Sequence, residues 1–196
     1  MSNHLYFFHI TKPFHITFDT KLSMKNFILL ALFFSTSLFA KEIKVFKSDR
    51  RLQILADDQS VIKEYKVVLG QTPIGEKTRS GDNKTPEGEY ILDYKNSKSL
   101  YHLAFHISYP NKAQIKKAKE EGYNPGGDIM LHGYPTKLST IAEWLTKMNF
   151  ENEAEEKVRN LMPLYDWTNG CIAVTNTEIE EIDSLIQIPI KITIYP

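Results

Sequence analysis

This chain of 196 residues has a single cysteine, no formal net charge and no long apolar run. It has one cysteine, so a disulfide within the chain is impossible and a cysteine-rich zinc site is excluded. Its 24 basic and 24 acidic side chains cancel, which leaves no sign of the basic face that nucleic-acid-binding proteins present. Its apolar runs are shorter than the roughly 20 residues of a membrane-spanning helix. The apolar fraction of 42% is ordinary for a globular core, and the length fits one domain.

The first 40 residues resemble an export signal and not part of a folded domain. Lys25 precedes a short apolar run, small and polar residues follow, and Ala40 stands at a suitable cleavage position. Because Met24 lies directly before this pattern, we expect translation to start there and residues 1–23 to be an over-extended reading of the gene. The mature protein would then begin near Lys41. The alternative interpretation is an N-terminal membrane anchor.

The sequence after residue 40 predicts one domain, 41–196, that is mainly β with helices (α+β). Alternating apolar runs between turn residues predict strands at 43–46, 52–56, 61–69, 90–94, 101–109, 128–131 and 190–194. Glycine and proline predict a long connection at 71–88. Helices are predicted at 112–121, 140–148, 151–162 and 177–186. Asn111 and Gly122 would cap the first, and capping boxes at 140–143 and 175–178 would begin the second and the last. The two middle helices would form an insertion at about 135–166.

The lone Cys171 is the first candidate for chemistry. An exported protein normally pairs its cysteines, so an unpaired thiol there is either accidental or reactive. A thiol needs a base, a cation or amide dipoles to become a nucleophilic thiolate, and a histidine such as His132 is the natural base. Gly170 allows close backbone approach, so nearby amides can face a developing oxyanion. Taken singly, each residue also has a structural interpretation: the cysteine as a small buried apolar side chain, the histidine as a strand-end residue.

The two candidates belong to a longer pattern of motifs. His132-Gly133 ends an apolar strand, and a second motif, Thr168-Asn169-Gly170-Cys171-Ile172, places its cysteine 39 positions after the histidine. Upstream lie Lys84-Thr85-Pro86-Glu87-Gly88-Glu89-Tyr90, the segment 105–111 and the segment 126–133. Together these motifs resemble the catalytic domain of the L,D-transpeptidase (YkuD-type) family, and the two segments resemble a Gram-negative subgroup of it. The resemblance implies a YkuD-like β-sandwich with the helical insertion between histidine and cysteine.

The resemblance also implies roles for individual residues. Cys171 would be the nucleophile, His132 the general base and later acid, and the carbonyl of Gly133 would orient the imidazole. The amides of Asn169, Gly170 and Cys171 would be candidate oxyanion donors.

Substrate contacts are expected from His106, Thr168 and Tyr134. His106 is equally well explained as part of the polar face of a strand, and this explanation is favoured for His102. Zinc held by these histidines and Cys171 would match no standard ligand spacing.

The implied substrate is a tetrapeptide stem of peptidoglycan. Attack at the L-centre of diaminopimelate would release D-alanine, and an amine of another stem or of a wall-attached protein would accept the acyl group. Water as acceptor would make the protein an L,D-carboxypeptidase. The resemblance further implies acylation by carbapenems, a periplasmic location in a Gram-negative bacterium, and no metal or organic cofactor.

The sequence departs from the family pattern at two positions near the cysteine. Asn169 stands where many members have histidine, and Ala173 where many have an arginine, so a carboxylate-binding fork is missing. Two other classes of protein were considered. Papain- and NlpC-like cysteine peptidases have the cysteine before the histidine, the reverse of the order here. A non-catalytic wall-binding module would keep Cys171 buried and inert.

Overall fold

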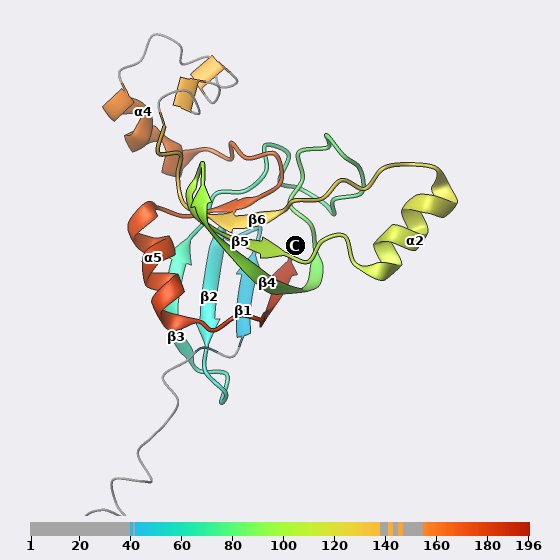
Figure 1. The fold of residues 1–196 in the computed structure, drawn as a ribbon, viewed down its shortest axis with the longest axis horizontal. Helices are drawn as coiled ribbons and strands as arrows, with labels where there is room; N and C mark the ends of the chain where they lie inside the picture. The colour runs from blue at the N-terminus through green and yellow to red at the C-terminus, as the bar shows by residue number, and fades with distance from the viewer. Residues whose placement is uncertain (1–39, 41, 138–140, 143–144, 147–154) are drawn as a thin grey trace, which may run out of the picture. The chain divides into compact units, whose positions relative to one another are not determined.

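The computed structural model describes residue 40 and residues 42–137, 141–142, 145–146 and 155–196. Within these residues, eight strands form one mixed sheet in the order β3-β2-β1-β8-β4-β5-β6-β7 (Figure 1). The strands are β1 (Glu42–Phe46), β2 (Arg51–Leu55), β3 (Val61–Lys66), β4 (Gly88–Ser99), β5 (His102–Ile107), β6 (Met130–His132), β7 (Ile172–Ala173) and β8 (Ile190–Tyr195). Together with the helices described below, they confirm the predicted fold class, mainly β with helices.

The last strand of the chain lies in the middle of the sheet. β8 pairs in parallel with β1, with Ile43 opposite Ile192, and antiparallel with β4, with Tyr90 opposite Ile192. The direction of the strands turns strongly between β1 and β6 (Figure 1). Inward side chains from β1 to β8 therefore share one apolar core, which α5 (Asn176–Leu185) joins through Ile179 and Ile182.

The helices with clear capping residues begin and end close to their predicted positions. α2 (Lys112–Glu121) has a complete capping box between Asn111 and Gln114, and ends at Gly122 with φ 73°. α5 has the capping box predicted between Thr175 and Glu178. No helix among the described residues is both long and apolar enough to cross a membrane.

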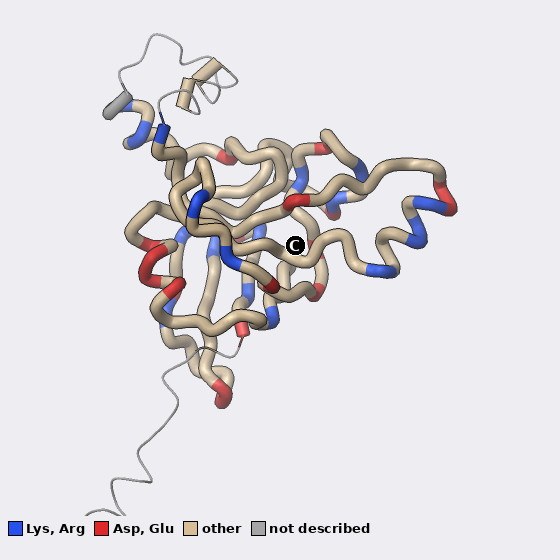
Figure 2. Tube along the Cα trace, viewed as in Figure 1, with Lys and Arg blue, Asp and Glu red and all other residues tan. Residues whose placement is uncertain are grey.

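Helix α2 carries an almost fully exposed, charged surface. Lysines lie along it and glutamates gather at its end (Figure 2), and only Ala118 is buried. Lys116 and Glu120 form an ion pair across one turn at 3.8 Å. Helix α2 therefore presents a charged, solvated surface.

A second apolar cluster lies on the other face of β6 and β7. Its buried members are Val68, Tyr134, Ile141, Leu145, Val158, Met162, Trp167 and Ala173, and Tyr101 packs against it. Helix α4 (Glu155–Leu161) and the 3-10 turn η1 (Met162–Leu164) contribute to this cluster. Parts of the predicted helices 140–148 and 151–162 lie outside the described residues. Those that are described place apolar side chains from 141–162 against the sheet.

Two predicted strands have different bounds in the structure. β3 ends at Lys66, and Val68 and Gly70 form only isolated bridges with Ala173 and Thr168. β4 extends to Ser99, beyond the predicted 90–94, because it pairs with β5 along its polar second half. Pairing across the hairpin stabilises residues whose own pattern is not strand-like.

Candidate active site

Cys171 lies directly before the short strand β7, at the edge of the sheet. β7 pairs in parallel with β6, with Leu131 opposite Ile172 and His132 opposite Ala173. This register continues to place Cys171 beside Met130, two residues before His132. Two residues along a strand span about 7 Å, so the pairing brings cysteine and histidine into one neighbourhood despite their 39-residue separation.

The sulfur of Cys171 contacts the backbone of the segment that leads into β6. The amide of Met130 donates to Sγ at 3.4 Å, and Sγ lies 3.8 Å from the carbonyl oxygen of Asp128. In a regular parallel ladder the Met130 amide would donate to a main-chain carbonyl. Gly170 has φ 124°, which turns the chain just before the cysteine and allows the sulfur to accept this bond instead.

His132 has one ring nitrogen engaged by its own backbone neighbour. Nδ1 hydrogen-bonds to the carbonyl oxygen of Gly133 at 2.6 Å. A carbonyl only accepts, so Nδ1 carries the proton, and in the neutral ring Nε2 has a free lone pair. The contact that the sequence predicted between the Gly133 carbonyl and the imidazole is present.

The imidazole is enclosed by aromatic rings from the second cluster. Its centroid lies 4.6 Å from that of Tyr101 and 5.9 Å from that of Trp167, and only 3% of His132 is exposed. This burial lowers the pKa of His132 to about 4, because a charged imidazolium would be poorly solvated there, and the bond to Gly133 opposes the shift only in part.

The thiol is likewise held in its neutral form. Burial raises the pKa of Cys171 to about 11, while the Met130 amide and the Lys77 ammonium act in the opposite direction. At neutral pH both groups are therefore uncharged, the thiol in the turn before β7 and the imidazole at the end of β6. Such a pair suits general-base activation during attack, since the imidazole is able to accept the proton that the thiol must lose.

Thr168 organises the turn before the cysteine. Its hydroxyl donates to the Cys171 carbonyl at 2.7 Å and accepts from the Gly170 amide at 3.1 Å. Its side chain is buried, so it shapes the turn where a substrate contact was expected. The Gly170 amide, one of the predicted oxyanion donors, donates to the Thr168 hydroxyl in this structure.

The remaining predicted contact residues have other partners in the structure. His106 is opposite Met130 on β5, but its ring bonds to Asp93 at 2.7 Å and stacks on Tyr94. Tyr134 is buried in the second cluster, edge-on to Trp167, whose ring also packs near that of His132. His102 pairs with Glu180 at 2.6 Å.

A pocket of ≈ 330 Å³ adjoins the neighbours of the cysteine. It is lined by Lys77, Ser80, Gly81, Asn83, Gly126, Gly127, Ile129 and Asn169. Ile129 directly precedes Met130, whose amide donates to the Cys171 sulfur, and Asn169 lies two residues before Cys171. Lys77 and its partner Asp82 were not singled out from the sequence, because nothing in a glycine-rich loop indicates which polar residues become buried.

A histidine at the end of β6 and a cysteine directly before the adjacent strand β7 of a mixed sheet point to the class to which the chain belongs. The chain is a member of the YkuD family, the L,D-transpeptidase catalytic domain, whose family model matches residues 40–192. This match confirms the resemblance found in the motifs.

Two bacterial proteins match most of this chain in sequence or structure. The protein named "Putative L,D-transpeptidase YafK" of Escherichia coli (strain K12) is 25% identical over 166 residues, covering 79% of this chain and 53% of YafK. The structure of Bdellovibrio bacteriovorus Bd1075 matches with 27% identity and a TM-score of 0.52, over 82% of this chain and 50% of that one.

The helical cell shape determining protein Pgp2 from Campylobacter jejuni (K307A mutant) shares the fold. Its structure matches at 24% identity with a TM-score of 0.53, over 79% of this chain and 46% of that one. The chain thus spans about half the length of each of these relatives.

Proposed function

We propose that this chain is an exported L,D-transpeptidase that acts on peptidoglycan stems through Cys171 and His132. The observation that carries the proposal is the β6–β7 pairing, in which the sulfur accepts the amide of Met130 two residues before His132. Membership of the YkuD family supplies the chemical class. The signal-like sequence before residue 41 supports export, here to the periplasm of a Gram-negative cell.

In the first step the thiol attacks the carbonyl that joins the L-centre of diaminopimelate to D-alanine. Nε2 of His132 accepts the Sγ proton as the S–C bond forms, and the carbonyl π pair moves onto oxygen. Amides beside the sulfur, those of Cys171 and Asn169, would donate to this oxyanion. The bond from Nδ1 to the Gly133 carbonyl holds the ring in the tautomer that accepts at Nε2 and stabilises the imidazolium that forms.

In the second step the C–N bond breaks and the imidazolium protonates the departing amine, so D-alanine leaves and a thioester remains on Cys171. An amine from another stem or a wall-attached protein then attacks the thioester, losing its proton to His132 while the thiol is restored. If water takes the place of the amine, the product is a tripeptide stem and the enzyme is a carboxypeptidase. We propose that either reaction contributes to cell-wall organisation and cell shape.

Product analysis with purified protein tests this proposal. Tetrapeptide muropeptides are incubated with the wild type and with Cys171→Ala, and both D-alanine and the stem products are quantified. We expect D-alanine from the wild type only, with cross-linked dimers exceeding tripeptide stems. An excess of tripeptide stems would show that the enzyme hydrolyses the thioester more than it transfers the acyl group. A folded wild type that releases no D-alanine would reject both activities.

A further inference from the structure

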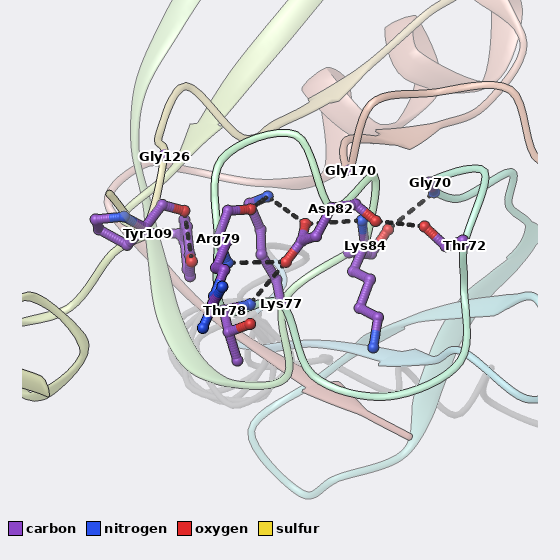
Figure 3. Close-up of polar contacts among 12 residues, drawn as sticks. Gly70, Thr72, Lys77, Thr78, Arg79, Asp82, Lys84, Tyr109, Gly126 and Gly170 are labelled. Atoms are coloured by element: carbon purple, nitrogen blue, oxygen red, sulfur yellow. Dashed lines mark hydrogen bonds and ion pairs between the residues drawn. The ribbon is translucent and has the colours of Figure 1, made fainter. Parts of the chain in front are cut away.

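The carboxylate of Asp82 bonds to several donors of the 77–84 loop, which lines the pocket near Cys171. It accepts the Lys77 ammonium at 2.7 Å and the amides of Thr78, Arg79 and Lys84 at 2.8, 2.9 and 3.1 Å (Figure 3). The Lys77 side chain is 3% exposed and that of Asp82 is 16% exposed. Although burial alone would raise the pKa of Asp82, Lys77 and the three amides lower it below its usual value, so the group is ionised at neutral pH.

The backbone of Asn83 and Lys84, which follow Asp82, packs against two glycines from distant parts of the chain, Gly70 and Gly170. A Cβ on Gly70 would stand 2.2 Å from the Asn83 carbonyl oxygen, and one on Gly170 would stand 2.5 Å from the Lys84 carbonyl oxygen. Only glycine permits both approaches. The Lys84 backbone is therefore packed against Gly170, the residue before the nucleophile, and the Asn83 backbone against Gly70, which itself lies next to Gly170.

Further bonds tie this loop to its surroundings. The Thr72 hydroxyl donates to the Asp82 carbonyl, and the Thr72 amide donates to the Asn83 carbonyl at 3.1 Å. On the opposite side the Ser80 amide donates to the Asn124 carbonyl at 2.8 Å, which joins the loop to the segment after α2. Displacing the 77–84 loop would thus move the pocket wall and the support of Gly170 together.

We propose that Asp82 is a positioning residue that fixes the Asn83 backbone against Gly70 and the Lys84 backbone against Gly170, and so holds Cys171 and its amide in reacting geometry. It touches neither the sulfur nor, in this account, the substrate. Its effect on rate comes from the accuracy with which the turn at 168–171 is placed. The inference rests on the proposed function, since it concerns the acylation of the same cysteine.

The test replaces the carboxylate by an amide in the full chain. Asp82→Asn keeps the size of the side chain but cannot accept all four donors. We expect the rate constant for acylation of Cys171 by a saturating tetrapeptide stem to fall about 10²-fold, the loss that a displacement of about 1 Å brings, with KM changing far less. Alkylation of Cys171 by iodoacetamide, which needs no oxyanion site, should stay close to the wild-type rate.

Controls separate positioning from loss of fold. Asp183→Asn removes an exposed carboxylate whose ion pair with Lys95 spans 2.8 Å, and it should leave both rates unchanged. Thr72→Val removes only the hydroxyl bond to Asp82, and should give a smaller loss in the same direction. It decides the question if Asp82→Asn does not fold. Wild-type acylation in a folded Asp82→Asn, or in Thr72→Val when Asp82→Asn does not fold, would overturn the inference.

A readout without turnover distinguishes this inference from the proposed function. The NMR shifts of the Gly170 and Cys171 amides should differ between the wild type and Asp82→Asn. If the wild type releases no D-alanine yet these shifts move, the proposed function fails and the positioning stands. If the shifts stay in place, the positioning fails whatever the activity.

Discussion

The amide of Met130 donates to the sulfur of Cys171, and this one bond of 3.4 Å joins the turn that carries the cysteine to the strand that carries His132. It also contributes to the electrostatics of the thiol, because a donated N–H favours the thiolate. Burial nevertheless dominates, and the resting pair is a neutral thiol and a neutral imidazole.

Alkylation kinetics should reveal this neutral thiol. Because burial raises the pKa of Cys171 to about 11, the native rate with iodoacetamide should increase about tenfold per pH unit from pH 7 to 9. The single cysteine makes intact mass a sufficient measurement. Protein unfolded in urea provides the reference, with a transition near the usual thiol pKa. A native rate already constant at pH 7 would indicate a preformed thiolate instead.

The buried imidazole should make folding stability depend on pH. The unfolded chain takes up a proton near pH 6.5, whereas the folded chain does so only near pH 4. The stability that His132 contributes is therefore present above pH 6.5 and is lost as the pH falls toward 4, by about 3 kcal/mol over the whole window. Urea unfolding of the wild type and His132→Gln across this range measures the difference. Parallel pH profiles for the two proteins would contradict the buried neutral ring.

The aromatic enclosure of His132 should be what keeps its pKa low. Trp167→Leu removes a ring 5.9 Å from the imidazole and 6.0 Å from Tyr101, so water gains access and the pKa of His132 should rise from about 4 toward 6.5. NMR titration of the imidazole protons follows this change. Phe46→Leu, which removes a ring stacked on Tyr195 elsewhere in the sheet, should leave the titration unchanged. Equal titration curves for Trp167→Leu and wild type would refute the role of the enclosure.

Gly133 should be intolerant of even one added methyl group. A Cβ there would lie 2.5 Å from Asn176 Oδ1, which accepts the Tyr134 amide at 2.7 Å. Gly133→Ala should therefore destabilise the protein by about 1–3 kcal/mol and displace the carbonyl that holds His132. Gly127→Ala meets no atom within 4 Å and should change the free energy of unfolding by less than about 0.5 kcal/mol. Chemical denaturation compares them, and equal stabilities would show that the site relaxes freely.

The elements that could be predicted from sequence are those whose signals are local. α2 and α5 begin at capping boxes and their bounds follow from Asn111 and Thr175. The pair His132 and Cys171 was found because its motif is specific to a family. The second half of β4 was missed because its polar residues become a strand only through pairing with β5.

The surroundings of the candidate site were much harder to foresee. The packing of Tyr101 and Trp167 on His132 joins segments 66 residues apart, and no periodicity encodes such a contact. Tyr134 and Thr168 were expected to contact substrate from their positions beside the motif residues, but their burial gives them supporting roles. The contacts of Asp82 depend on how a turn-rich loop closes, which its composition does not specify.

Whether Cys171 carries the acyl group is the most direct test of the proposed function. Wild-type protein, Cys171→Ser and His132→Gln are each mixed with a tetrapeptide stem, quenched in acid and analysed by intact mass and peptide mapping. We predict a tripeptide-stem adduct on Cys171 of the wild type with an equal amount of D-alanine, no thioester in Cys171→Ser, and acylation slowed about 10²- to 10⁴-fold in His132→Gln. An adduct on another residue, or a folded wild type that forms none and releases no D-alanine, would contradict the account.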